Sequence, residues 1–320
     1  DEYAAFATFP DARSPYPALP ELDPALENAG KGDGQLDWID LIEEYAGRAT
    51  RSDIPAEPHT THPEQRSWLR LDHWRVDATY IPSSGDRFGL FTGYGSATIG
   101  LPKIKGVTLT PAFAYNSVDG PDAFAIPGTL YDASVEAAWM TRVDERWRMR
   151  IAGTGGIYSD NGRASLLESG RVGGMSLFTF EWHPDLQVVI GSLFVNIDNL
   201  LVLPILGVVY QPDDDRRYEF VFPEGKLARK IKTTTEKTRW IYMSWGFFGR
   251  TWRVDRPNGQ TDKMTYSDWR VSTGLENKSI SGMTTFVEVG VSFARDLEFG
   301  FSPGSYRPGT VGYARAGLHF

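Results

Sequence analysis

The 320-residue sequence contains no cysteine. Without thiols the chain can form no disulfide scaffold, no thiolate metal site and no thiol nucleophile. It also lacks an uninterrupted apolar run of about 18 residues, the length that a membrane-spanning helix needs. A helical membrane span is therefore excluded. A membrane-spanning β-barrel is not excluded, because its strands show alternation of apolar and polar residues instead of continuous hydropathy.

Clusters of basic residues are also missing. The chain has 33 Lys and Arg against 41 Asp and Glu, a net charge of -8, and its basic residues are dispersed. This balance argues against a nucleic-acid partner. The amino end, Asp1-Glu2-Tyr3, has neither the basic start nor the apolar core of a signal peptide. If the protein is exported, we expect this numbering to begin at the mature terminus.

Residues suited to catalysis or metal binding are scarce among the five histidines. His59 and His62 have the spacing of a metal-binding pair, but they lie in a Pro-rich segment with no third ligand nearby. A hydrolase at a barrel rim would need a Ser or Asp together with His. His183 falls in a predicted turn, and His319 stands one residue from the end. We therefore expect no enzyme, no metal and no cofactor.

Two regions differ in composition. Residues 1–66 are rich in Pro, Asp and Glu without alternation, which predicts an extended arm, and residues 67–320 form the main body. Within the arm, residues 36–46 have apolar residues at helical spacing and a following Gly47, which predicts a short helix. Its apolar residues are Trp38, Ile39, Leu41, Ile42 and Tyr45. Two interpretations stay open: the helix docks on the main body, or it plugs the barrel or binds a periplasmic or envelope protein.

The main body reads as a succession of alternating segments separated by Gly, Pro, Asp and Asn. No helix-period segment interrupts them, so they predict a meander of antiparallel strands that closes as a sandwich or a barrel. The expected strands are 68–80, 87–100, 106–116, 129–142, 146–158, 171–182, 186–196, 200–210, 216–222, 226–234, 237–253, 263–277, 282–295 and 310–320.

The placement of aromatic residues favours a membrane barrel over a soluble sandwich. In one segment Val287, Val289 and Val291 share a face, opposed by Glu288 and Ser292. Either fold would give this alternation, but large aromatics stand near strand ends, as interfacial girdles require. These aromatics are Trp68, Tyr80, Trp139, Trp147, Trp182, Tyr210, Trp240 and Trp252. We expect an all-β, transmembrane, antiparallel up-and-down barrel of about 14 strands, or 12 if 216–234 is a hairpin outside the membrane.

Charged residues of both signs occupy the face opposite the apolar one. The residues predicted to line the lumen are Arg75, Asp77, Asp132, Glu136, Arg146, Arg148, Arg150, Arg217, Glu219, Asp268, Arg270, Glu288 and Arg315. Buried charges must be paired or hydrated. They therefore indicate either a mutually neutralised ladder that fills a narrow barrel or the lining of a polar pore.

The carboxyl end carries a local signal. The segment 312–320 alternates and ends with Leu318 and Phe320 on its apolar face. It resembles the terminal strand signal of bacterial outer-membrane proteins. This resemblance implies insertion by the barrel-assembly machinery and a location in the bacterial outer membrane, in contact with its lipid.

A wider resemblance covers residues 68–320. The segments 200–215, 218–226 and 240–252, the pair Tyr131-Asp132 and the segment 156–160 are similar to an uncharacterised outer-membrane barrel family of unknown function, frequent in planctomycete-like bacteria. The resemblance implies the fold and the location, and no reaction or ligand. The sequence thus predicts a passive channel or transporter for small solutes whose mouth is modulated by the arm. The alternative is a non-conducting structural or docking protein whose arm binds an envelope partner.

Overall fold

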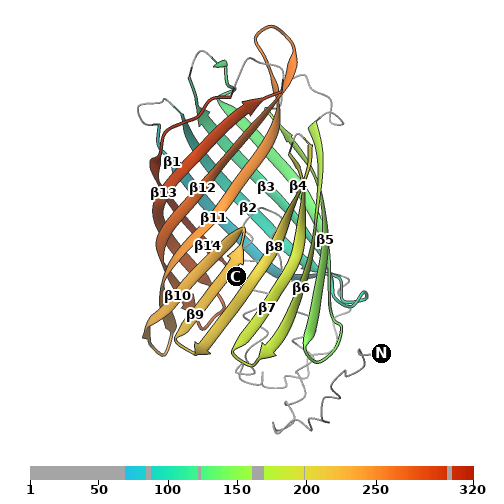
Figure 1. Ribbon diagram of the computed structural model, residues 1–320, viewed down its shortest axis with the longest axis vertical. Coiled ribbons are helices and arrows are strands. Elements are labelled where there is room, and N and C mark those ends of the chain that lie inside the picture. Colours follow the sequence, from blue (N-terminus) through green and yellow to red (C-terminus); the bar gives the residue numbers. More distant parts are fainter. Residues whose placement is uncertain (1–68, 84–87, 122–123, 161–168, 198, 301–304) are drawn as a thin grey trace, which may run out of the picture.

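The protein forms one closed antiparallel barrel (Figure 1). The computed structural model describes residues 69–320 apart from 84–87, 122–123, 161–168, 198 and 301–304. Within this part of the chain, no helix is long and apolar enough to cross a membrane. The predicted arm, with its helix at 36–46, lies outside the described residues.

Fourteen strands build the wall, and each overlaps one of the segments expected from alternation. The predicted barrel is confirmed, and the twelve-strand alternative is wrong because β9 and β10 both belong to the wall. The strands are β1 (Arg70–Ile81), β2 (Gly89–Gly100), β3 (Val107–Asp119), β4 (Thr129–Arg142), β5 (Trp147–Ser159), β6 (Gly170–His183), β7 (Leu186–Ile197), β8 (Asn199–Asp213), β9 (Arg216–Phe222), β10 (Glu224–Thr233), β11 (Lys237–Asp255), β12 (Thr261–Ser279), β13 (Thr284–Phe299) and β14 (Val311–His319).

Each strand pairs with its neighbours in sequence, and β14 closes the ring against β1. In this last pairing Ala78 lies opposite Ala316, and the Phe320 amide donates to the Trp74 carbonyl at 3.0 Å. Because successive strands run antiparallel, all odd-numbered connections lie at one end of the barrel. That end carries the segments 120–128, 160–169 and 300–310, and the other has turns as short as 184–185 and 214–215. We call these the long-loop end and the turn end.

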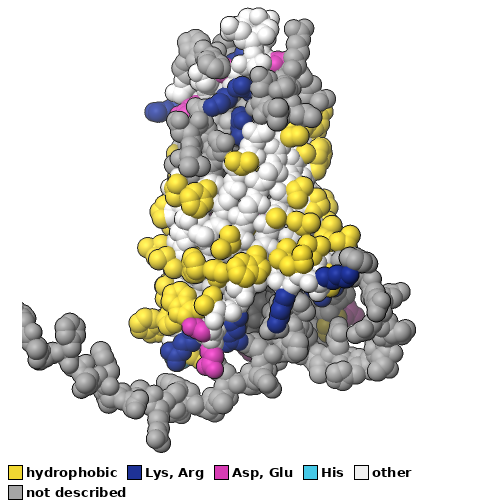
Figure 2. Space-filling view, turned by 90° about the vertical axis from the view of Figure 1, so that its right-hand side faces the viewer, with side chains coloured by type: hydrophobic (Ala, Val, Ile, Leu, Met, Phe, Trp, Pro, Cys, Tyr) yellow, Lys and Arg dark blue, Asp and Glu magenta, His cyan; other side chains and the backbone are white. Residues whose placement is uncertain are grey.

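The outer surface is apolar because every second residue of each strand points away from the barrel. In β13, Val289 is 54% exposed, whereas the neighbouring Glu288 is 7% exposed. Figure 2 shows hydrophobic side chains spread over the wall, with charged side chains nearer its ends. Exposed apolar side chains on the wall include Val76, Phe113, Val135, Ile151, Ile190, Leu206, Phe220, Ile241, Val271, Val287 and Val291.

The aromatic residues predicted near the interfaces divide into two groups. Tyr80, Trp139, Trp147, Trp182 and Tyr210 are exposed on the outer surface. Trp240 is half-buried, and Trp68 lies outside the described residues.

The prediction for Trp252 is wrong. This side chain is 1% exposed and points into the barrel, where its indole Nε1 donates to Asp132 at 2.5 Å. The segment 237–253 has aromatics on both faces, so alternation alone gave no way to orient it.

Apolar side chains also fill two parts of the interior. One cluster lines the inner face from β4 to β9 and includes Leu177, Val189 and Ile205. The second lies at the long-loop end and includes Ile81, Leu130 and Trp252. The charged residues predicted from sequence therefore share the interior with these apolar clusters.

Val289 offers a direct test of the outer face. Replacing Val289 with Arg should lower the free energy of unfolding from lipid by about 2–4 kcal/mol if the side chain lies near the bilayer midplane. Urea titration in lipid vesicles measures this loss. Val143→Arg, in the exposed turn between β4 and β5, is the matched control and should change stability by no more than about 0.5 kcal/mol. Equal effects of the two substitutions would show that Val289 does not face lipid.

Candidate functional site

The charged interior is organised as ion pairs between neighbouring strands. Asp77 on β1 accepts from Arg75 Nε at 2.7 Å and from Arg315 Nε of β14 at 3.2 Å. The two guanidinium groups also lie over the ring of Phe286, at 5.7 and 5.3 Å from its centroid. One carboxylate thus balances two arginines at the seam where the barrel closes.

Other predicted residues pair locally. Arg150 of β5 donates to Glu136 of β4 at 2.6 Å, and both side chains are buried. Arg217 is bonded to Glu219 on β9. Arg148 lies 3.6 Å from Glu181. These pairs lie on the side of the barrel where the interior is largely apolar.

Arg146 lies elsewhere. It is exposed in the turn between β4 and β5, where Asp144 Oδ1 accepts from its backbone amide at 2.7 Å. The sequence prediction of Arg146 as a lumen residue is therefore wrong. The tight turn breaks the alternation one residue before β5 begins.

Asp132 is the centre of a buried network between β3, β4 and β11. Its Oδ2 accepts from Arg250 Nη1 at 2.8 Å and from Asn116 at 3.2 Å, while its Oδ1 accepts from Trp252 Nε1 at 2.5 Å. Asp132 is on β4 and Arg250 on β11, so the network joins strands that are far apart in the sequence.

A second polar group lies between β10 and β14. Lys226 Nζ is 3.1 Å from Glu276, which is also paired with Lys278 at 2.9 Å. Glu288 accepts hydrogen bonds from the hydroxyls of Tyr242 at 3.1 Å and Tyr313 at 2.6 Å.

Asp268 and Arg270 form the third group. Asp268 Oδ2 accepts from Arg270 Nε at 2.9 Å and from Ser292 at 2.5 Å. Across the described charges, acidic and basic side chains therefore largely neutralise one another.

Two cavities lie among these groups. The first, of about 40 Å³, is bordered by Lys226, Tyr242 and Glu288. The second, of about 60 Å³, is bordered by Asp77, Arg250 and Trp252. Each has room for a few water molecules. Phe248, Arg270 and Arg315 border both cavities, so these three side chains form the partition between them.

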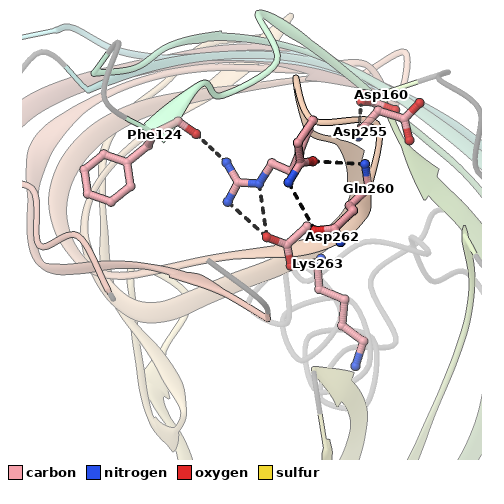
Figure 3. Close-up of polar contacts among 8 residues, drawn as sticks. Phe124, Asp160, Asp255, Gln260, Asp262 and Lys263 are labelled. Atoms are coloured by element: carbon pink, nitrogen blue, oxygen red, sulfur yellow. Dashed lines mark hydrogen bonds and ion pairs between the residues drawn. The ribbon is translucent and has the colours of Figure 1, made fainter. Parts of the chain in front are cut away.

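Arg256 links several segments at the long-loop end. Its guanidinium donates to the Phe124 carbonyl in the β3–β4 connection and to Asp262 Oδ2 at 3.0 Å. It also lies over the Phe299 ring at 4.1 Å, and Phe299 stacks on Phe124. Figure 3 shows the hydrogen bonds to Phe124 and Asp262, with the Gln260 carbonyl accepting from the Arg256 backbone amide at 2.8 Å. One arginine thereby ties the β3–β4 and β11–β12 connections to the ends of β12 and β13.

The wall has an irregular seam beside this mouth. The short strands β9 and β10 turn at Pro223, so β11 loses its β10 partner beyond Gly246. Further along, β11 bridges β5 instead, with Arg253 opposite Ser159. The Asp160 amide donates to the Arg253 carbonyl at 3.2 Å. At this level the ring consists of β1–β5 and β11–β14, and β6–β10 lie outside it.

Several interior charges were missed by sequence reasoning. Glu276 shares the parity of Asp268 and Arg270 on β12, so alternation could have identified it. Alternation could not have identified Arg295 as an interior residue, because Ala294 has a φ of 48° and the register between β12 and β13 shifts there. The resulting bulge turns Arg295 inward, out of the period-2 pattern.

Of the remaining predicted site residues, the structure describes only the two of the assembly signal. Leu318 is half-buried opposite Val76 on β1, and Phe320 is 49% exposed. The predicted plug residues and the histidine pair at 59 and 62 lie outside the described residues.

Sequence comparison places the chain in a family. A family described as a domain of unknown function, DUF6268, matches residues 100–302. The chain belongs to the DUF6268 family. The expected membership of an uncharacterised family is thus confirmed, and the planctomycete origin stays a prediction. Among curated proteins, none matches the sequence.

Solved structures with a similar fold are distant in sequence. The NanC porin has a TM-score of 0.39 and 12% identity, over 77% of this chain and 98% of that chain. The COG4313 outer membrane channel from Pseudomonas putida F1 has a TM-score of 0.38 and 12% identity, over 81% and 99%. A mutant Rh. blastica porin has a TM-score of 0.28 and 10% identity, over 79% and 99%.

The Asp132 network predicts a large loss on removing its acceptor. Asp132→Ala leaves Arg250 without its charged partner and should lower the free energy of unfolding by about 3–5 kcal/mol. Asp213→Ala breaks an exposed pair with Arg216 at the turn end and should cost at most about 1 kcal/mol. Urea unfolding of both variants in the same detergent gives the comparison, and equal losses would contradict the central role of Asp132.

Proposed function

We propose that this DUF6268 protein is an outer-membrane barrel that acts as a passive channel for small solutes, with its outer mouth closed in this conformation. The apolar outer wall supports the location, because lipid can solvate it while all strand edges are paired around the ring. The long-loop end then faces outward and the turn end faces the periplasm.

The observation that carries the channel proposal is the pair of charged cavities that share the partition of Phe248, Arg270 and Arg315. Successive polar spaces inside a membrane wall are the expected lining of a solute path. Contacts of Arg256 and the apolar cluster around Leu130 cover the outer end of this path. The contact between Arg256 and Phe124 joins two connections between strands, which can move without breaking the ring.

Residues 1–66 are proposed to modulate the inner mouth. The apolar residues of the predicted helix, such as Trp38 and Leu41, need a surface to cover them, and the turn end is the nearest one along the chain. Assembly by the barrel-assembly machinery and a periplasmic or envelope partner for the arm stay predictions.

A non-conducting structural or docking protein is the second candidate. The observations that favour it are the neutralised charges and the two apolar clusters inside the barrel. In that case the arm would recruit an envelope partner. The expectation that the protein has no enzymatic activity stays a prediction under both proposals.

Arg256 tests the channel proposal. Arg256→Ala removes the link between the β3–β4 and β11–β12 connections, so mean conductance in planar bilayers should rise about twofold or more as the mouth opens locally. Arg307→Ala, at the same end with a side chain 79% exposed, is the matched control and should leave conductance unchanged. Zero conductance of the wild type and of Arg256→Ala would contradict the channel and support the structural role.

The arm is tested by deletion of residues 1–60. If it covers the inner mouth, conductance rises while the barrel still assembles, because the strands close among themselves. Assembly is checked by the faster migration of the unboiled protein on a denaturing gel. An unchanged conductance, with loss of a bound envelope protein from pull-downs, would contradict the gating role.

A further inference from the structure

The arm and the barrel differ in net charge. Residues 1–66 contain 14 Asp and Glu against 5 Lys and Arg, whereas residues 67–320 contain 27 against 28. The excess of negative charge in the chain therefore belongs to the arm. The arm joins the barrel at β1, and β1 begins at the turn end because the β1–β2 connection lies at the long-loop end.

The predicted helix at 36–46 is amphipathic. With about 100° of rotation per residue, most of its apolar side chains fall on one side and its acidic side chains on the other. The apolar side holds Trp38, Leu41, Ile42 and Tyr45, and the acidic side holds Asp37, Asp40, Glu43 and Glu44. A binding site for this helix needs an apolar surface beside a cationic one.

The turn end is cationic on the side of β10–β12. Segments 224–240 and 274–283 hold seven Lys and Arg against three Glu. Asp215 in the β8–β9 turn pairs with Lys230 at 2.8 Å and brings the carboxylates to four. This side therefore keeps a net positive charge after its ion pairs are counted.

Two lysines flank an aromatic ring on the inner face of this side. Trp240 lies opposite Lys230 on β10 and Glu276 on β12. The Nζ atoms of Lys230 and Lys278 lie 5.4 and 5.9 Å from the centroid of its ring. The two lysine side chains are 20% and 48% exposed, so a further carboxylate can approach both.

The β4–β9 side of the same end is apolar. Ala138, Val189 and Val209 of the interior cluster lie within four residues of the ends of their strands there. They are buried, and the partly buried residues packed against the cluster, Met140 and Leu203, belong to the same wall. A sheet buries the apolar side chains of one face only beneath another layer. The cluster thus needs a layer over it inside the barrel.

We propose that the helix at 36–46 docks inside the turn end as this layer. Its apolar side lies on the β4–β9 cluster, and its acidic side faces Lys230 and Lys278. Residues 47–69, which connect the helix to β1, span at most about 80 Å when extended, so the helix can reach both sides of this end. The inference rests on the proposed channel function, because the docked helix is the element by which the arm closes the inner mouth.

Docking of this kind depends on ionic strength. Ion pairs between partly exposed groups are screened by salt, and the Debye length falls from about 10 Å at 0.1 M to about 3 Å at 1 M. The apolar contacts are not screened in this way. The arm therefore acts as a latch that salt weakens.

A single cysteine at position 41 reports on docking, because the chain has no other thiol. The rate at which a water-soluble maleimide modifies Leu41→Cys in the full-length protein in detergent is compared with that of Val143→Cys, in the exposed turn between β4 and β5. Docking should slow the reaction at position 41 about tenfold or more, and about 1 M salt should accelerate it. Equal rates for the two cysteines would overturn the proposal.

Charge reversal and charge exchange test the cationic side. Lys230→Glu with Lys278→Glu should accelerate modification of Leu41→Cys about tenfold at low salt, as expected for the loss of several partly exposed ion pairs. Adding Asp40→Lys and Glu44→Lys to the same chain should restore the slow rate. A barrel damaged by the first two substitutions would not be restored by changes in the arm.

A matched control reverses two charges at other turns of the same end. Arg146→Glu with Arg216→Glu should leave the rate at position 41 unchanged. Migration of unboiled protein on a gel confirms that each barrel is closed. Equal acceleration by this control and by the lysine reversal, or failure of the charge exchange to restore the slow rate, would overturn the docking site.

The outcomes distinguish this inference from the channel proposal. Protection of position 41 that is lost on lysine reversal, without conductance in any variant, would refute the channel and leave the docking site standing. Conductance of the wild type together with an unprotected position 41 would overturn the docking site and leave the channel standing.

Discussion

Closure of the backbone hydrogen-bond ladder is the constraint on which the rest of this structure depends. In lipid, the environment proposed for this barrel, an unpaired amide or carbonyl is costly, so β14 must return to β1 and every strand must alternate. Alternation then assigns each side chain to the wall or to the interior. The charges that cannot face lipid are gathered inside, where they have to find partners.

In the interior, single carboxylates meet this requirement by pairing with two donors each. Asp77 serves two arginines and Glu276 serves two lysines, while tyrosine hydroxyls satisfy Glu288. The described buried charges therefore largely neutralise one another inside the barrel.

The sequence was informative wherever period 2 was unbroken. The number of strands, their order and the inward direction of Arg75, Glu136 and Glu219 all followed from alternation. It was not informative where two faces had similar composition, as in the aromatic segment containing Trp252. The sequence could not reveal the pairing of β5 with β11 either. That pairing depends on how far β9 and β10 extend, and no local sequence pattern marks it. Charge partners 118 residues apart, such as Asp132 and Arg250, are likewise a product of the closed ring.

The seam at the long-loop end limits how the protein can widen. There the circumference is set by β1–β5 and β11–β14, with β6–β10 outside the ring. Because fewer strands form the ring here, the barrel is narrower at this end. Enlarging the narrow rim by moving strands would require the β5–β11 junction at Ser159 and Arg253 to part, leaving backbone groups without partners. Displacing the connections held by Arg256 leaves the ring intact, so the smaller motion lies in the loops.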